Sequence, residues 1–227
     1  MPLTSAIQDY AKAIYALEER GAEAVSTNAL AERLGVTPAS ASSMVKRLGQ
    51  LGLVEHRPYR GVTLTDRGRR VALEVMRHHR LLELYLVENL GVPWDRVHDE
   101  AEVLEHVLSE QLEERIAAKL GNPSRDPHGD PIPTPELELE IAPSRSLQSL
   151  EPGMSGRFTR ISDSDPEMLR FLAERGIAPG DRLEVIDKQP FDGPLFVRFG
   201  GSVQVLGGPL AEAMRVEVDE PQAGEER

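Results

Sequence analysis

The chain has 227 residues and no cysteine, which excludes a disulfide framework and any zinc site built on thiolates. No apolar run approaches the roughly 18 residues of a membrane-spanning helix, and the N-terminus lacks the charged and apolar parts of a signal peptide. We therefore expect a cytoplasmic protein with no membrane partner, long enough for one large domain or two small ones.

Charge is distributed unevenly along the chain. The net charge of −12 argues against a nucleic-acid partner when taken alone. However, residues 37–70 carry seven basic and two acidic side chains, a local charge of +5. Residues 76–140 carry six basic and fifteen acidic side chains, a local charge of −9. This separation predicts an anionic partner for the first segment and a cation for the second.

Three helices are predicted in the first fifty residues. Residues 5–19 have an amphipathic pattern, and residues 26–35 form a short helix that a Ser or Thr can cap and that Gly35 ends. Thr37 and Pro38 then start a third helix that runs to about Gly49. A helix, a short turn with glycine and a second helix have the spacing of a helix-turn-helix.

The third helix has the composition of a helix that reads DNA. Outside its apolar face the residues are small or hydroxylated, and two cations follow. Small side chains allow close approach to the major groove, while hydroxyls and cations can contact bases and phosphates. The alternative is an ordinary surface helix rich in Ser and Ala. The predicted DNA contacts of this helix are Thr37, Ala39, Ser40, Ser42, Ser43, Lys46 and Arg47.

A β-hairpin is predicted directly after this helix. Residues 53–56 and 62–65 have strand patterns, and residues 58–61 form a turn between them. A hairpin in this place is a wing, and Arg57 and Arg60 near its tip could contact phosphates or the minor groove. A winged helix-turn-helix is a more specific signal of DNA binding than either part alone.

The stretch from His78 to His106 holds four of the six histidines and seven acidic residues. On a helix that turns about 100° per residue, four side chains would share about a third of the circumference, those of His98, Glu102, Glu105 and His106. Without a cation such groups would repel or desolvate one another, although a solvated charged face is the simpler alternative. Imidazole and carboxylate without thiolate suit Mn(II), Fe(II), Zn(II), Co(II) or Ni(II). The predicted ligands here are His79, Glu83, His98, Glu102, Glu105 and His106.

The remaining chain falls into four parts. Residues 107–120 continue an apolar helical stripe that could form dimer contacts. Residues 121–135 form a proline-rich loop, in which we expect His128 to be exposed, and residues 136–149 resemble a linker. Five short β-patterned runs and one helix between 150 and 218 predict a small β-barrel. We expect the tail, 219–227, to be disordered.

The segments MRHHRLLELYLVENLG, VHDEAEVLEHVLSEQLEERI and SRDPHGDPIP resemble the diphtheria toxin repressor family of iron- and manganese-dependent regulators. The resemblance covers residues 2–217 and implies a mainly α fold with a C-terminal all-β domain. It implies a winged helix-turn-helix (1–70), a helical metal-binding and dimerisation domain (71–140), a linker (141–149) and an SH3-like, FeoA-like barrel (150–218). The implied function is a homodimeric, metal-dependent regulator of transcription, usually a repressor, that binds double-stranded operator DNA.

The resemblance also implies two sets of metal ligands. Asp9, Glu102, Glu105 and His106 match one site; His79, Glu83 and His98 match the second, to which Asp165 or Glu167 of the barrel could add. Iron-type members have Met on the first helix and Cys at the position of Glu102, so carboxylates at both places favour Mn(II). Fe(II) is the alternative, and Zn(II), Co(II) or Ni(II) could bind in vitro. Some manganese-type members have a second acid where this chain has Lys12, which leaves the number of metals open.

Two other classes of function fit the sequence less well. A di-metal enzyme would need Glu-x-x-His or His-Glu-x-x-His on its helices, and this sequence has neither. A winged-helix regulator with an organic effector would not need the clustered His and Glu side chains. The sequence therefore favours a metal-responsive regulator that is not an enzyme.

Overall fold

The computed structural model describes residues 3–57, 60–163, 165–191 and 193–219. Their contacts divide the chain into two compact units. Unit 1 comprises Met1–Leu82, Glu102–Lys119 and Ile132–Leu139, and unit 2 comprises Glu83–Ala101, Leu120–Pro131 and Glu140–Arg227. Two helices, α4 (Asp66–Leu90) and α5 (Val97–Leu104), contribute residues to both units.

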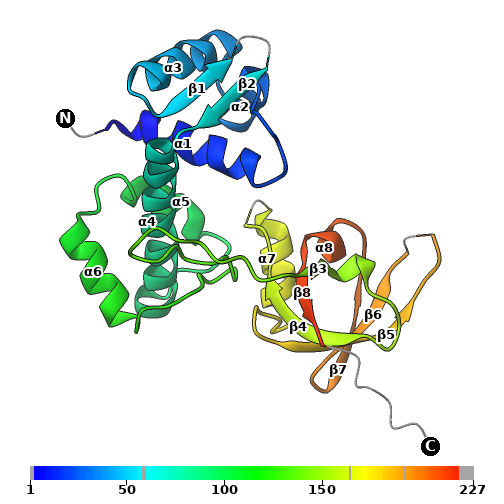
Figure 1. The fold of residues 1–227 in the computed structure, drawn as a ribbon. Coiled ribbons are helices and arrows are strands. Elements are labelled where there is room, and N and C mark those ends of the chain that lie inside the picture. Colours follow the sequence, from blue (N-terminus) through cyan, green and yellow to red (C-terminus); the bar gives the residue numbers. More distant parts are fainter. Residues whose placement is uncertain (1–2, 58–59, 164, 192, 220–227) are drawn as a thin grey trace, which may run out of the picture. The chain divides into compact units, whose positions relative to one another are not determined.

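Unit 1 begins with a winged helix-turn-helix (Figure 1). Its elements are α1 (Ser5–Glu18), α2 (Thr27–Arg33), α3 (Pro38–Gln50), β1 (Val54–Arg57) and β2 (Gly61–Leu64). The side chains of Ser26 and Thr37 accept hydrogen bonds from backbone N–H groups in the first turns of α2 and α3, as N-caps do. The antiparallel pair β1–β2 confirms the predicted wing. The predicted turn includes Pro58 and Tyr59, which lie outside the described residues.

Helix α1 packs on two sets of neighbours within unit 1. Ile7, Tyr10 and Ile14 belong to the core of the helix-turn-helix, together with buried residues of α2, α3 and the wing. Ala11 and Tyr15 instead pack against the N-terminal half of α4. Because residues three or four apart share a helix face, one amphipathic helix joins both cores.

The helical part of unit 1 differs from the sequence prediction at one point. The helix predicted to include residues 98–106 ends at Leu104, and a turn at 105–107 separates α5 from α6 (Glu110–Lys119). Ser109 accepts a hydrogen bond from the N–H of Leu112 and so caps a new helix. Glu105 and His106 therefore do not follow the helical phase of α5, and the helical-wheel argument was wrong for these two residues.

Unit 2 contains a six-stranded antiparallel sheet with the strand order β3-β8-β4-β5-β6-β7 (Figure 1). The strands are β3 (Arg145–Ser146), β4 (Ser155–Arg160), β5 (Arg182–Lys188), β6 (Leu195–Phe199), β7 (Ser202–Leu206) and β8 (Arg215–Val218). The other elements are the 3-10 helix η1 (Leu147–Ser149), α7 (Pro166–Ala173) and α8 (Gly208–Ala213). The five predicted strands are confirmed. Residues 141–149, expected to be a linker, contain β3 and η1, because Leu147 is fully buried in the core of the barrel.

The proline-rich loop packs tightly on the barrel within unit 2. The Ile161 N–H donates to the carbonyl of His128, at 2.9 Å. A Cβ at Gly129, which has a φ of +86°, would lie 1.9 Å from the Thr159 carbonyl oxygen, so only glycine permits this approach. His128 is consequently 0% exposed, and the expectation of an exposed loop histidine was wrong.

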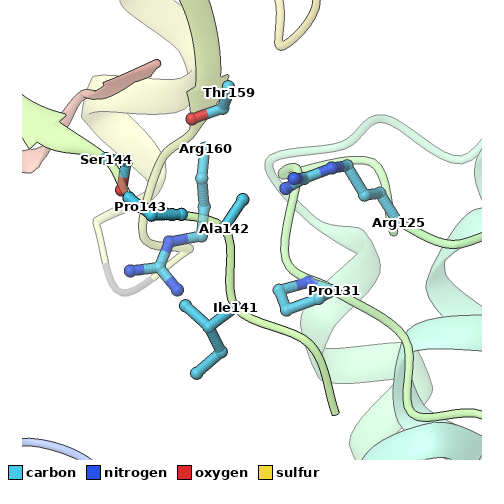
Figure 2. A pocket seen from close by; sticks show the side chains of 8 residues that line it. All are labelled: Arg125, Pro131, Ile141, Ala142, Pro143, Ser144, Thr159 and Arg160. Carbon is cyan, nitrogen blue, oxygen red and sulfur yellow. The ribbon is translucent and has the colours of Figure 1, made fainter. Parts of the chain in front are cut away.

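Figure 2 shows this loop beside the start of the barrel: Arg125 and Pro131 face the segment 141–144 and Arg160. The cavity between them is about 20 Å³, room for about one water molecule. It is too small for an organic effector. Among the described residues, no helix is both long and apolar enough to cross a membrane.

Candidate metal centres and DNA-binding surface

Four of the predicted ligands come together in unit 1. Asp9 projects from α1, Glu102 from the last turn of α5, and Glu105 and His106 from the turn after it. Each of the four offers one ligand atom, and these atoms lie within 4.8 Å of one another. We call Asp9, Glu102, Glu105 and His106 the first cluster.

Glu105 is the most enclosed member of the first cluster. Its side chain is 0% exposed, and its carboxylate contacts Lys12 and His79. The Lys12 Nζ lies 2.7 Å from Oε1 and 3.0 Å from Oε2, and the His79 Nδ1 lies 2.5 Å from Oε2. Lys12 also donates to Glu102, at 2.7 Å. A buried carboxylate is stable only with such partners or with a metal ion.

His106 is oriented by a neighbour on α1. Its Nδ1 lies 2.9 Å from the Gln8 Oε1 and its Nε2 lies 2.9 Å from the Asp9 Oδ1. An amide oxygen only accepts hydrogen bonds, so Nδ1 carries the proton that it donates to Gln8. Nε2 is then the atom that can bind a metal, as in metal sites where a second residue orients the ligand.

The chemistry of the first cluster fits a hard divalent cation. It offers three carboxylates and one imidazole, with no sulfur donor. The Asp9 Oδ1 is buried without a hydrogen-bond partner, although the His106 imidazole is close to it. Burial raises the pKa of Asp9, and Glu102 adds to this while His106 opposes it. A cation at this position would relieve both the unsatisfied oxygen and the repulsion among the acids.

Unit 2 holds another group of acids and imidazoles around Glu83, whose side chain is 1% exposed. His98 Nδ1 lies 3.5 Å from the Glu83 Oε1 and 2.8 Å from the Asp163 Oδ2. Asp126 and His128 of the proline-rich loop form a further candidate group with Glu83, again with ligand atoms within 4.8 Å. We call Glu83, His98, Asp126, His128 and Asp163 the second cluster.

His128 has the orientation of a metal-binding imidazole. Its Nε2 donates to the carbonyl of Trp94, at 2.8 Å, and its ring stacks on the Trp94 ring at a centroid distance of 5.8 Å. The Nδ1 is directed at Glu83, at 3.7 Å from Oε2, and is buried with no hydrogen-bond partner. One nitrogen fixed by a carbonyl and the other left for an ion is a common arrangement in metal sites.

The acids of the second cluster raise the pKa of both histidines. Asp163 and then Glu83 raise the pKa of His98 to about 10, against the opposing effect of burial. Burial lowers the pKa of His128, but Glu83 outweighs it and raises this pKa to about 9. Burial raises the pKa of Asp163, and His98 more than reverses this, so its pKa lies below the ordinary value.

Three further predicted ligands are His79, Asp165 and Glu167. His79 stands one turn before Glu83 on α4, and within unit 1 its Nδ1 contacts Glu105. Asp165 caps α7 by accepting a hydrogen bond from the Glu167 N–H, and Glu167 is exposed. Sequence reasoning missed Asp163, Asp126 and His128. The spacing of Asp126 and His128, two residues apart in the proline-rich loop, is the signal that could have indicated these two residues.

The predicted DNA contacts form one exposed face of α3. Ala41, Val45 and Leu48 are buried in the helix-turn-helix core, so the opposite face is turned to solvent. Exposed on or near that face are Thr37, Ala39, Ser40, Ser43, Lys46 and Arg47, and Ser42 is half-buried. Arg60 is exposed at the wing, and Arg57 is the last residue of β1. The contact of these residues with DNA remains a prediction.

Comparison with known proteins gives three successive matches. Residues 2–62 match the N-terminal DNA binding domain of the iron dependent repressors, and residues 65–134 match their metal binding and dimerisation domain. Residues 145–218 match the FeoA domain. The iron-dependent repressor IdeR of Mycobacterium tuberculosis is 34% identical over 95% of this chain and 98% of its own length.

Solved structures of two relatives have the same fold over nearly the whole chain. A manganese-dependent transcriptional repressor in complex with manganese is 48% identical, with a TM-score of 0.84, over 92% of this chain and 98% of its own. IdeR of T. acidophilum is 30% identical, with a TM-score of 0.73, over 93% of this chain and 97% of its own. The chain therefore belongs to the iron-dependent (diphtheria toxin) repressor family and is a metal-dependent, DNA-binding transcriptional repressor, not an enzyme.

Proposed function

We propose that this repressor senses Mn(II), binds a pseudo-palindromic operator as a homodimer and controls metal-transport genes from the cytoplasm. The observation that carries the choice of metal is the donor set of the first cluster. Three carboxylates and one imidazole favour a hard ion such as Mn(II). Mn(II) lies low in the order of metal affinities, and sulfur ligands would select other metals. The manganese complex of the 48% identical relative supports the same ion.

The first cluster gives a reason why metal would control DNA binding. Asp9 and Gln8 lie on α1, which packs into the core of the helix-turn-helix, whereas the other ligands lie at the end of α5 and after it. An ion bound by both sets would fix α1 relative to the 102–106 segment. Metal then favours the DNA-competent arrangement through its higher affinity for that state.

The homodimer is supported by apolar side chains that unit 1 leaves uncovered. Val103, Val107 and Leu112 are 71%, 78% and 49% exposed, and all three belong to the 102–119 segment. A two-fold dimer through this face would present two α3 helices to major-groove segments about 34 Å apart, or a multiple of that distance. An operator read in this way is a pseudo-palindrome.

The test compares the wild type with Asp9→Ala on operator DNA obtained by selection from random sequences with Mn(II). We expect the wild type to bind the operator with Mn(II) and to lose most of its affinity with chelator. Asp9→Ala should bind the same DNA weakly under both conditions. If Asp9→Ala bound the operator with Mn(II) as tightly as the wild type does, Asp9 would not act as a bridge between α1 and the 102–106 segment.

The second candidate is an Fe(II)-responsive repressor on the same scaffold. It is favoured by the relatives named as iron-dependent repressors, at 33–34% identity. Titration with Mn(II) and with Fe(II) under anaerobic conditions, followed by operator binding at matched saturation, separates the two. Stronger operator binding with Fe(II) at equal occupancy would replace Mn(II) by Fe(II) in the proposal.

A further inference from the structure

Lys12 is a basic side chain among the ligands of the first cluster. It lies one turn after Asp9 on α1. Its Nζ is 2.7 Å from the Glu102 Oε1, and both oxygens of Glu105 lie within 3.0 Å of it. The ammonium therefore contacts two of the three carboxylates that a divalent ion would use.

The charges of the first cluster explain this position. Asp9, Glu102 and Glu105 together carry three negative charges, and the Glu105 side chain is 0% exposed. Carboxylates this close, one of them out of contact with water, need a positive charge to remain ionised together. In the metal-free protein, Lys12 supplies one such charge.

An ammonium and a divalent ion compete for the same carboxylate oxygens at short distance. Two cations bound to Glu102 and Glu105 would lie within a few ångströms of each other and repel strongly in this partly buried place. No oxygen of Glu105 lies outside the reach of the ammonium. A metal bound to Glu105 thus competes directly with Lys12 and favours a position of Lys12 farther from this carboxylate.

Lys12 is able to move. Its side chain is 20% exposed, so part of it already contacts water. The lysine stem has four flexible carbons and carries a compact charge that is strongly hydrated when released. The ammonium can leave the cluster without becoming a buried, unpaired charge.

We propose that Lys12 is a tethered cation that holds the first cluster together without metal and that a divalent ion must displace. The proposal rests on the proposed metal-sensing function and deepens it. Lys12 lowers the affinity of the cluster for the ion, so the concentration of metal at which the repressor responds is set partly by this residue. It also prevents repulsion among Asp9, Glu102 and Glu105 in the metal-free state.

The experiment uses the full chain and Mn(II) chloride as the probe. Calorimetric titration gives the Mn(II) affinity of the first cluster, and thermal melting in chelator gives the stability of the metal-free protein. The variants are Lys12→Met, which keeps most of the length of the side chain and removes its charge, and Lys12→Arg, which keeps the charge. Lys119→Met, at the exposed end of α6, is the control for net charge.

We expect Lys12→Met to bind Mn(II) about tenfold more tightly, since the ion no longer competes with a charge-assisted hydrogen bond. The metal-free variant should melt about 2–4 °C lower because Glu105 loses its cation. Lys12→Arg should bind Mn(II) more weakly than the wild type, since a guanidinium holds carboxylates through two hydrogen bonds. Lys119→Met should change neither quantity.

If the wild type binds Mn(II) and Lys12→Met binds it no more tightly, this proposal is overturned and the proposed function is not. If Lys12→Met does not fold, Lys12→Arg decides: equal or tighter Mn(II) binding than the wild type overturns the proposal. A wild type that binds no Mn(II) at all would overturn the proposed function and this inference together.

Discussion

The first and second clusters solve the same electrostatic problem by different means. Each gathers carboxylates around one that is almost completely buried, Glu105 in unit 1 and Glu83 in unit 2. In the first cluster the main counter-charge is the ammonium of Lys12, whose pKa is lowered by burial but raised overall by Glu105 and Glu102. In the second, the counter-charges are the imidazoles of His98 and His128, with pKa values of about 10 and about 9.

The two kinds of counter-charge imply different conditions for metal binding. A lysine that stays protonated at every physiological pH leaves as an intact cation, so its displacement depends little on pH. A protonated imidazole must lose its proton before it can bind a metal. Displacement of Lys12 from the first cluster releases no proton, whereas binding through His98 and His128 does, so we expect metal binding to the second cluster to depend more strongly on pH.

The largest effect is expected from Glu105→Gln. The substitution leaves Lys12 and His79 without their buried carboxylate, and breaking a buried charge pair costs on the order of 3 kcal/mol. We expect this loss in urea unfolding of the metal-free protein, together with loss of Mn(II) binding at the first cluster. Glu110→Gln, an exposed acid of α6, is the control. If Glu105→Gln, like its control, changed stability by less than about 0.5 kcal/mol, the buried carboxylate of Glu105 would not be a structural partner of Lys12 and His79.

The pH dependence of Mn(II) binding tests the second cluster. Glu105→Gln removes Mn(II) binding at the first cluster, so binding in this variant reports on the second cluster. For each proton released on binding, its affinity for Mn(II) should rise about tenfold per pH unit between pH 6 and 8.5. In a His98→Asn background, the first cluster should show a much smaller slope. Asp163→Asn, which removes the largest cause of the raised pKa of His98, should flatten the dependence of the second cluster. Equal slopes for both clusters would remove the distinction between them.

The same pKa values predict the stability of the metal-free protein. The pKa of His98 is raised from 6.5, so its contribution to stability is fully present below about pH 6.5. The contribution is lost as the pH rises toward 10. Metal-free melting temperatures should accordingly fall from pH 7 to pH 10, and should fall less in Asp163→Asn.

The smallest effect is expected from Gln8→Ala. Loss of the oxygen that orients His106 should weaken Mn(II) binding at the first cluster about tenfold, the lower end of the effect of such supporting residues. Gln8→Glu, which keeps an acceptor oxygen, should retain most of the affinity. Gln111→Ala, at an exposed position of α6, should have no effect. An unchanged affinity in Gln8→Ala would mean that His106 needs no support from α1.

Local patterns were sufficient to predict the architecture of the N-terminal part. Ser26 and Thr37 cap the helices that their sequence positions indicated, and the apolar spacing of Ala41, Val45 and Leu48 determined which face of α3 is buried. The barrel strands were likewise readable from their alternation. Such features depend on neighbours in the chain, which is why a sequence reveals them.

The first cluster was only partly predictable. Spacing indicated Glu102, Glu105 and His106, and the resemblance added Asp9 and grouped the four residues in one site. Their assignment as ligands stays a prediction. The helical-wheel argument failed for Glu105 and His106 because a turn follows Leu104. The contact of Lys12 with Glu102 and Glu105 joins residues 90 and 93 positions apart, and no local pattern indicates such a pair.

The sequence by itself determined the class of fold, the family and the kinds of donor atoms available for a metal. Tertiary structure alone decided which donors meet. His128 appeared to be a loop residue, yet the Gly129–Thr159 approach buries it beside Glu83. Asp163 stands in an acidic stretch like several others, and only the packing of unit 2 brings it to His98. The physical reason is that burial and charge are properties of surroundings, which long-range packing creates and residue spacing does not record.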